Sequence, residues 1–208
     1  MRKAAICILV LCIAIRSSGQ DKARGTREPK RFKYYFNSGI GYYLPFESSK
    51  WLADRGAAYA FNFQCNYRDR YFTHLYFDMA VINYSKENTV VNNVASNFDY
   101  KLNANNVGLD IGYTLPMKKV SPYIYAGLGL SFMDTPFIKP GSAANDIVFG
   151  TKTNAFFQYR GAIGVDYKIS RYFILYLEAM YSSTAFKSVL DDQRLQGVSL
   201  ILGFKTPL

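Results

Sequence analysis

The sequence contains no run of about 18 apolar residues, the length that a helix needs to cross a bilayer. Hydrophobic residues nevertheless make up 50% of its 208 residues. It has one histidine, one tryptophan and three cysteines, and it lacks the spacings HExxH, CxxC and DxDxD. It has neither a heptad pattern nor a low-complexity tract. These absences argue against a membrane-spanning helix, a coiled coil and the common zinc and calcium motifs.

The first 19 residues have the three parts of a secretory signal peptide. A positive start leads into the apolar run Ala4–Ile15, and the small residues Ser17 and Gly19 then stand at the −3 and −1 positions of a cleavage site. We therefore expect residues 1–19 to be a signal peptide. Cleavage would leave Cys65 as the only cysteine, so the mature chain could form no internal disulfide.

Residues 20–32 form a basic segment with few apolar side chains. Such a composition favours a solvated, flexible tether, so we expect a periplasmic lead-in to the folded domain. A basic run could also bind acidic lipid or peptidoglycan. Nucleic acid is not an expected partner, because the signal peptide exports the chain.

Eight segments with alternating apolar and polar residues follow the lead-in, and this period of two predicts β-strands. In the second segment, Tyr59, Phe61 and Phe63 share one face. In the fourth, the apolar parity changes near Ala104, which predicts a β-bulge. The predicted strands are 32–44, 58–67, 71–84, 98–115, 123–132, 153–167, 172–183 and 195–204.

The connections between these segments alternate strictly between long and short, with a long one first. The short connections are 68–70, 116–122 and 168–171, and the long, polar ones are 45–57, 85–97, 133–152 and 184–194. Outer-membrane barrels have this asymmetry, with short periplasmic turns, longer outer loops and an even number of strands. The order of the connections places both termini in the periplasm.

The composition of the polar face distinguishes a membrane barrel from a soluble one, which needs a solvated exterior rich in charge. Here the polar face is made of Asn, Gln, Gly and Ser, which suit the narrow lumen of a small barrel. The predicted fold is all-β: an eight-stranded antiparallel up-and-down transmembrane β-barrel over residues 33–208. The predicted location is the outer membrane of a Gram-negative-type cell.

Two segments carry a resemblance to a known family. The strand PYIYAGLGL (122–130) and the closing strand GVSLILGF (197–204) resemble those of small outer-membrane barrels of the OmpA and OmpX type. The resemblance implies that Leu200, Leu202 and Phe204 form a C-terminal signal for the barrel-assembly machinery. Four residues follow Phe204, which departs from the family pattern. Membrane lipids and this machinery are the implied partners.

One candidate site is a polar cluster on the lumen face, formed by His74, Asp78 and Asn62. A catalytic histidine needs a nucleophile and an orienting group within reach. Barrel-type lipid A deacylases carry a serine two residues after the histidine, whereas this chain has Tyr76 there. We therefore expect a hydrogen-bonded lumen histidine, with no catalytic residue, cofactor or metal ligand.

Two pairings across the lumen follow from the predicted turns. Arg160 and Glu178 are expected to lie nearly opposite on the sixth and seventh strands and to form an ion pair, since charges in a tight barrel must be matched. In the hairpin around residues 68–70, Asn62 is expected opposite Asp78. The same register places Gln64 opposite Tyr76 and Asn66 opposite His74.

Three functions remain open at this stage. The first is a non-enzymatic barrel with a structural or adhesive role, whose loops meet an extracellular protein. The second is an accessory barrel of an outer-membrane assembly or secretion system, similar to PorT-like components, with a periplasmic partner. The third is a lipid-modifying enzyme, against which the missing nucleophile argues.

Overall fold

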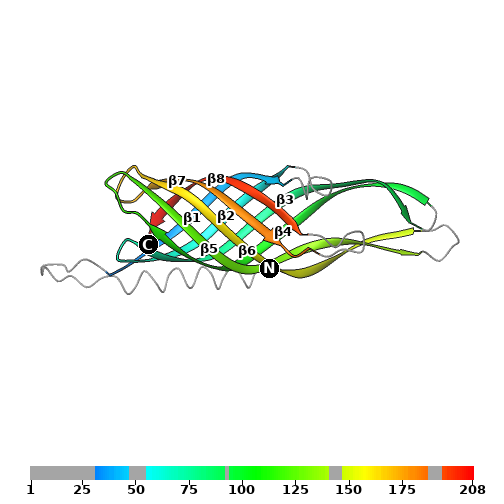
Figure 1. The fold of residues 1–208 in the computed structure, drawn as a ribbon, viewed down its shortest axis with the longest axis horizontal. Helices are drawn as coiled ribbons and strands as arrows, with labels where there is room; N and C mark the ends of the chain where they lie inside the picture. The colour runs from blue at the N-terminus through cyan, green and yellow to red at the C-terminus, as the bar shows by residue number, and fades with distance from the viewer. Residues whose placement is uncertain (1–30, 47–54, 92–93, 141–146, 187–193) are drawn as a thin grey trace, which may run out of the picture. The chain divides into compact units, whose positions relative to one another are not determined.

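The computed structural model describes residues 31–46, 55–91, 94–140, 147–186 and 194–208. They form a single sheet of eight strands, drawn from blue to red in Figure 1. The strands are β1 (Phe32–Pro45), β2 (Gly56–Tyr67), β3 (Tyr71–Val91), β4 (Val94–Thr114), β5 (Val120–Pro140), β6 (Ile147–Lys168), β7 (Ile174–Thr184) and β8 (Leu195–Pro207).

The sheet closes on itself, because β1 pairs with β8 as well as with β2. Every pairing is antiparallel, and apart from the closing pair β1–β8 each joins strands that are consecutive in the sequence, so the prediction of an eight-stranded up-and-down barrel is confirmed. Closure leaves no exposed sheet edge within the wall of the barrel. In the part of the chain that the structure describes, no helix is long and apolar enough to span a bilayer.

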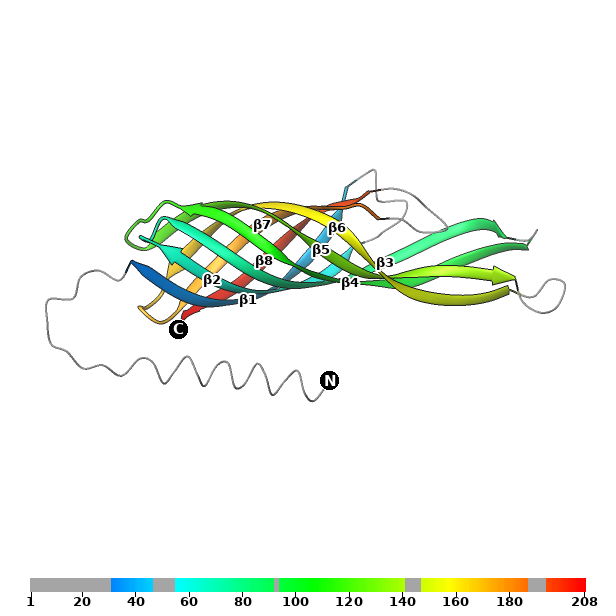
Figure 2. The same ribbon diagram turned by 90° about the horizontal axis from the view of Figure 1, so that it is seen from below.

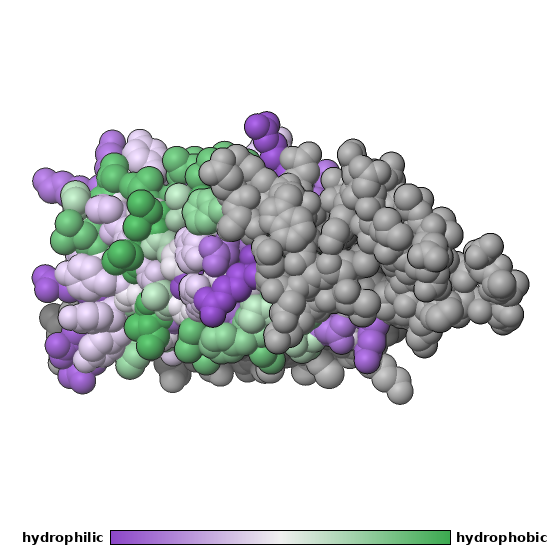
Figure 3. Space-filling model, turned by 45° about the vertical axis from the view of Figure 1, so that its right-hand side comes forward, coloured by the Kyte–Doolittle hydropathy of each residue, from purple (hydrophilic) through white to green (hydrophobic). Residues whose placement is uncertain are grey.

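The side chains alternate between a polar interior and an apolar exterior, the reverse of a soluble protein. Ile111 and Tyr42, for example, are 73% and 71% exposed on the outer face, whereas Asp110 is 1% exposed inside. Figure 3 shows this outer face as a green band beside a hydrophilic rim. Because lipid tails solvate apolar side chains, the arrangement fits a barrel that spans a membrane.

The hairpin between β2 and β3 has a register two residues away from the predicted one. Asn62 lies opposite Tyr76, Gln64 opposite His74, and Asn66 opposite Phe72. The predicted faces are correct, but the predicted partners are wrong. The reason is the turn, where Arg68 and Asp69 both have positive φ and centre the hairpin on Asp69.

Two of the predicted loops are largely strand, so the expected long loops 85–97 and 133–152 are corrected. The β3–β4 ladder continues to Val91 and Val94, and the β5–β6 ladder to Pro140 and Ile147. Figures 1 and 2 show both hairpins extending beyond the barrel wall. We call this end of the barrel the long-loop end, and the end with the three tight connections the short-turn end. Segments 47–54 and 187–193, within the other two long connections, lie outside the described residues.

The predicted bulge near Ala104 is wrong. The β3–β4 pairing is continuous there, and its register shifts between Lys86 and Thr89. Leu102 and Ala104 point into the barrel, where they are 1% and 2% exposed. The apolar parity changes in the sequence because the interior of the barrel becomes apolar towards the long-loop end.

Candidate functional site

The lumen is filled by side chains, and aromatic rings from some strands pack against glycines on other strands. Tyr76 is fully buried, and its hydroxyl lies where a Cβ added at Gly108 or Gly129 would be. These two glycines are opposite each other on β4 and β5. The backbone can therefore approach the ring closely only because both positions lack a side chain.

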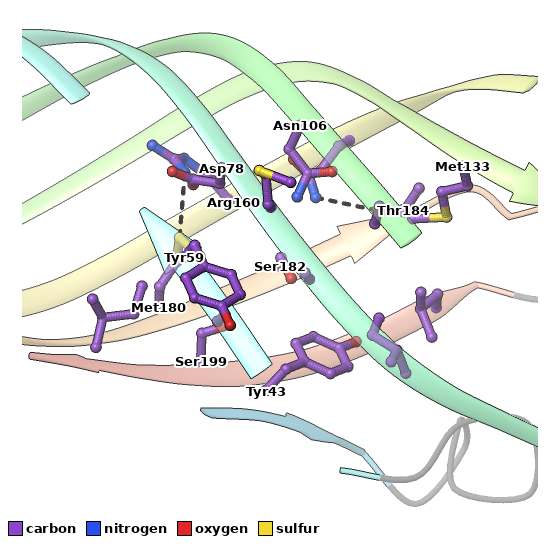
Figure 4. A pocket seen from close by; sticks show the side chains of 18 residues that line it. Tyr43, Tyr59, Asp78, Asn106, Met133, Arg160, Met180, Ser182, Thr184 and Ser199 are labelled. Atoms are coloured by element: carbon purple, nitrogen blue, oxygen red, sulfur yellow. Dashed lines mark hydrogen bonds and ion pairs between the residues drawn. The ribbon is translucent and has the colours of Figure 1, made fainter. Parts of the chain in front are cut away.

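Arg160 on β6 is the centre of the lumen network and is only 4% exposed. Its Nε lies 2.9 Å from Asp110 Oδ1, and its Nη2 lies 2.5 Å from Asp110 Oδ2. Its Nη1 donates to Asp78 Oδ2. The guanidinium carbon is 3.3 Å from the centroid of the Tyr76 ring. Figure 4 shows Asp78, Arg160 and Met180 pointing toward one another inside the barrel. Such a stacked guanidinium binds two buried carboxylates at once, with two hydrogen bonds to Asp110 and one to Asp78, whose Oδ1 has no hydrogen-bond partner.

The expected pair of Arg160 with Glu178 is not formed among the described residues. Across the β6–β7 ladder, Arg160 lies opposite Ser182, and Glu178 lies opposite Gly164. Both side chains do point inward and are buried, as predicted. The strands bring the two residues to different levels of the lumen, so the arginine takes its carboxylates from β3 and β4 instead.

Glu178 is held by two tyrosine hydroxyls from β5. Tyr123 donates to its Oε2 at 2.8 Å and Tyr125 to its Oε1 at 2.7 Å. Nearer the short-turn end, Lys205 Nζ lies 2.9 Å from Asp166 Oδ1. Lys205 follows the predicted closing signal, and the structure shows that it belongs to β8 and is 3% exposed inside the barrel.

His74 lies between the arginine network and the short-turn end, and it is 1% exposed. Its Nδ1 is 3.3 Å from Asp110 Oδ2, and its Nε2 is 3.0 Å from Gln64 Oε1. The rings of Phe72 and Tyr125 pack against it. Among the described residues, the ring nitrogens of His74 bind a carboxylate and a side-chain amide and no hydroxyl group, so the ring has a carboxylate to orient it but no nucleophile bound to it.

The predicted polar cluster is therefore joined through residues that the sequence did not single out as partners. His74 and Asp78 meet through Asp110 and Arg160, rather than through each other. Asn62 is 5% exposed in the lumen, and its Oδ1 has no hydrogen-bond partner. Asp110 and Gln64 also belong to the cluster, although the prediction had not grouped them with His74. Their inward parity was readable, but their contacts depend on how the barrel closes.

An apolar cluster fills the lumen next to this network, on the side of the long-loop end. Its buried members are Tyr43, Ile82, Leu102, Ala104, Met133, Phe186 and Leu195. Between the cluster and Arg160 is a cavity of about 30 Å³, and a second one of about 40 Å³ lies by Asp166. Spaces of this size hold one or a few water molecules. Neither cavity has room for a lipid or a sugar.

The three residues of the predicted assembly signal lie on the outer face of β8. Leu200, Leu202 and Phe204 are 48%, 59% and 38% exposed. Phe204 stacks on Phe173 with ring centroids 5.7 Å apart. Their recognition by an assembly machinery stays a prediction.

Residues 30–205 match the outer membrane protein beta-barrel domain. The chain therefore belongs to the family of outer-membrane proteins built on this barrel, and its location is the outer membrane. No curated protein sequence matches it.

Solved structures with the same fold include OprG from Pseudomonas aeruginosa and Neisserial surface protein A. OprG is 12% identical, with a TM-score of 0.55, and the match covers 85% of this chain and 95% of OprG. The Neisserial protein is 12% identical, with a TM-score of 0.50, over 84% of this chain and 95% of that one. The outer membrane enzyme PagL is also similar, at 12% identity and a TM-score of 0.42, over 84% and 99%. Likenesses at these identities show the fold alone.

Proposed function

We propose that this protein is a non-catalytic outer-membrane barrel that presents its two long β-hairpins as a binding surface for an extracellular protein. The observation that carries the proposal is the length of β3–β4 and β5–β6 beyond the closed wall. The β2–β3 ladder ends at Ile82 and the β4–β5 ladder at Ala104 and Met133. The two hairpins continue without these neighbours.

Each projecting hairpin has backbone edges that no described strand covers. In β4, residues 94–103 pair with β3 on one side only, and in β5, residues 134–140 pair with β6 on one side only. Unpaired N–H and C=O groups along a strand can bind an extended segment of another protein as an added strand. A partner with an exposed edge strand or an extended peptide fits this surface.

The orientation that we propose places the long-loop end outside the cell and both termini in the periplasm. The asymmetry between short and long connections supports it, because outer-membrane barrels have short periplasmic turns. In this orientation, the hairpins extend towards the medium. The closing residues Leu200, Leu202 and Phe204 then lie on the strand that the barrel-assembly machinery would read.

The packing of the lumen supports a role without catalysis. The two lumen cavities hold water at most, and His74 bonds to Gln64 and Asp110 rather than to a hydroxyl nucleophile. The guanidinium of Arg160 binds the carboxylates of Asp78 and Asp110, and two tyrosine hydroxyls bind Glu178, which suits a structural network. The lumen thus acts as a rigid support for the hairpins.

Photo-cross-linking in intact cells tests the proposal and separates it from the periplasmic alternative. A photoreactive residue at Asn103, which is exposed on β4, should give a cross-linked protein from outside the cell. The matched position at Lys118, in a short turn, should give none. Cross-links from Lys118 alone would instead favour an accessory role in assembly or secretion.

A second variant separates binding from folding. Replacing residues 85–99 by an Asn-Gly turn joins Tyr84 to Tyr100, which are opposite each other in the ladder, so it removes the end of one hairpin and leaves the closed wall intact. In electrophoresis without heating, we expect the variant to migrate as a folded barrel. A photoreactive residue at Asn103 of this variant should no longer give the cross-link. Retention of the cross-link would contradict the proposal.

A further inference from the structure

The short-turn end of the barrel is strongly basic. Every short connection carries at least two Lys or Arg residues, and so does the start of the first strand. Against these eight cationic residues stands one acidic residue, Asp69. The basic rim consists of Arg31, Lys33, Arg68, Arg70, Lys118, Lys119, Lys168 and Arg171, all of them exposed.

At the long-loop end of the barrel, the numbers of acidic and basic residues are equal. Its connections, with the strand ends that lead into them, contain eight acidic and eight basic residues. These segments are 46–55, 85–101, 134–152 and 187–194. The excess of positive charge is therefore specific to the short-turn end and does not simply reflect a basic protein.

Among the described residues, most of the positive charge of the rim has no acidic partner. Lys33 Nζ lies 2.6 Å from Asp69 Oδ2, which uses the one carboxylate of the rim. The other nearby acidic side chain, Asp166, points into the lumen and pairs with Lys205. The rim therefore presents a net positive field to its surroundings.

A belt of exposed aromatic side chains lies directly beside the basic rim. Its members are Phe32, Tyr34, Tyr71, Tyr113, Tyr167 and Tyr172. The guanidinium carbon of Arg171 is 4.5 Å from the centroid of the Tyr172 ring, and that of Arg68 is 5.2 Å from the Tyr67 centroid. Aromatic belts mark the level where the apolar core of a membrane meets the headgroups. The rim therefore lies at the level of lipid phosphates.

We propose that the basic rim binds the phosphate groups of anionic phospholipids in the leaflet at the short-turn end. The cationic residues come from the start of β1 and from the turns β2–β3, β4–β5 and β6–β7, so they are distributed around the whole mouth of the barrel. A ring at headgroup level fits a lipid leaflet, whereas one compact protein partner would contact one side of it. In the orientation proposed above, this is the periplasmic leaflet.

Energy transfer in vesicles tests the proposal, and it does not depend on the orientation of the barrel when both leaflets have the same composition. A donor dye is attached to Cys65, near the rim, in a variant with Cys7→Ser and Cys12→Ser. The vesicles are phosphatidylcholine with a small fraction of acyl-labelled acceptor lipid, either phosphatidylglycerol or phosphatidylcholine. Basic residues near a membrane surface attract anionic lipid, and one such residue changes the local lipid ratio by about five-fold, so we expect at least about five-fold more transfer to the phosphatidylglycerol acceptor than to the phosphatidylcholine acceptor at low salt.

The variants are matched in charge. Lys118→Gln with Lys119→Gln should reduce the preference for phosphatidylglycerol, whereas Lys101→Gln with Lys152→Gln, at the long-loop end, should leave it unchanged. Added salt should reduce the wild-type preference, because it screens exposed charges. Equal transfer to both acceptors would overturn the proposal, as would an equal loss in both double variants. Retention on purified peptidoglycan that depends on the rim, without any lipid preference, would assign the rim to that polymer instead.

Discussion

Replacing Arg160 by methionine should destabilise the barrel strongly, because two buried carboxylates depend on this one guanidinium. Asp110 receives two of its hydrogen bonds, at 2.9 and 2.5 Å, and Asp78 receives a third. Methionine fills a similar volume but leaves both charges unmatched. Removing one partner from a buried ion pair costs about 3–5 kcal/mol. This is a large part of the 5–15 kcal/mol that stabilises a typical folded domain.

The assay is urea unfolding of the barrel in phospholipid vesicles, with the folded fraction read from electrophoretic mobility without heating. Lys152→Met on the same strand is the matched control, since Lys152 is exposed and should change stability by no more than about 0.5 kcal/mol. Adding Asp78→Asn and Asp110→Asn to Arg160→Met should recover part of the loss, because it removes the unmatched charges. A cost for Arg160→Met no larger than the control, or purely additive effects in the triple variant, would refute the network.

Three further outcomes follow from the packed lumen. Gly112→Ala should lower the free energy of unfolding by about 1–3 kcal/mol, because the added methyl group meets the ring of Phe72. Adding Phe72→Leu should restore most of that loss, and a lack of rescue would place the clash elsewhere. Tyr125→Phe should lower the free energy of unfolding in urea by about 1–3 kcal/mol, since it removes a hydrogen-bond donor to buried Glu178. The same change should lower it less in a Glu178→Gln background. An equal loss there would count against this contact. Purified protein in planar bilayers should give no conductance steps, and discrete channel openings would contradict a closed lumen.

The sequence predicted which way the strand residues face, because a period of two is a local property. The apolar row of Tyr59, Phe61 and Phe63 is outside, and His74 and Asp78 are inside, as expected. Local parity also explains the error near Ala104. There the interior changes from polar to apolar, and the sequence cannot distinguish that change from a bulge.

The contacts across the lumen could not be predicted, because they depend on the register of several turns together. Arg160 and Asp78 are separated by 82 residues and belong to strands that are not neighbours in the sheet. The turn at Arg68 and Asp69 adds to the difficulty, since both residues have positive φ without the Gly or Asn that usually indicates such a turn. A difference of two residues at this turn moves every partner across the hairpin.

Strands β3, β4, β5 and β6 are longer than the sequence predicted, and the reason is physical. Beyond the membrane, a strand has no lipid to face, so its outward positions need not be apolar. Residues 85–91 and 94–97 lack the apolar alternation that identified the wall, yet they continue the β3–β4 ladder. Polarity therefore indicated where the hairpin leaves the membrane and not where the strand ends.

Labelling of single cysteines on intact cells tests the central claim, which is that the long hairpins face the medium. In a Cys65→Ser background, cysteines placed at Asn92 and at Ala143 should react with a membrane-impermeant maleimide. A cysteine at Asp69, in the β2–β3 turn, should react only after the outer membrane is opened. Labelling of Asp69→Cys on intact cells, with protection of Asn92→Cys and Ala143→Cys, would reverse the orientation and contradict the proposed function.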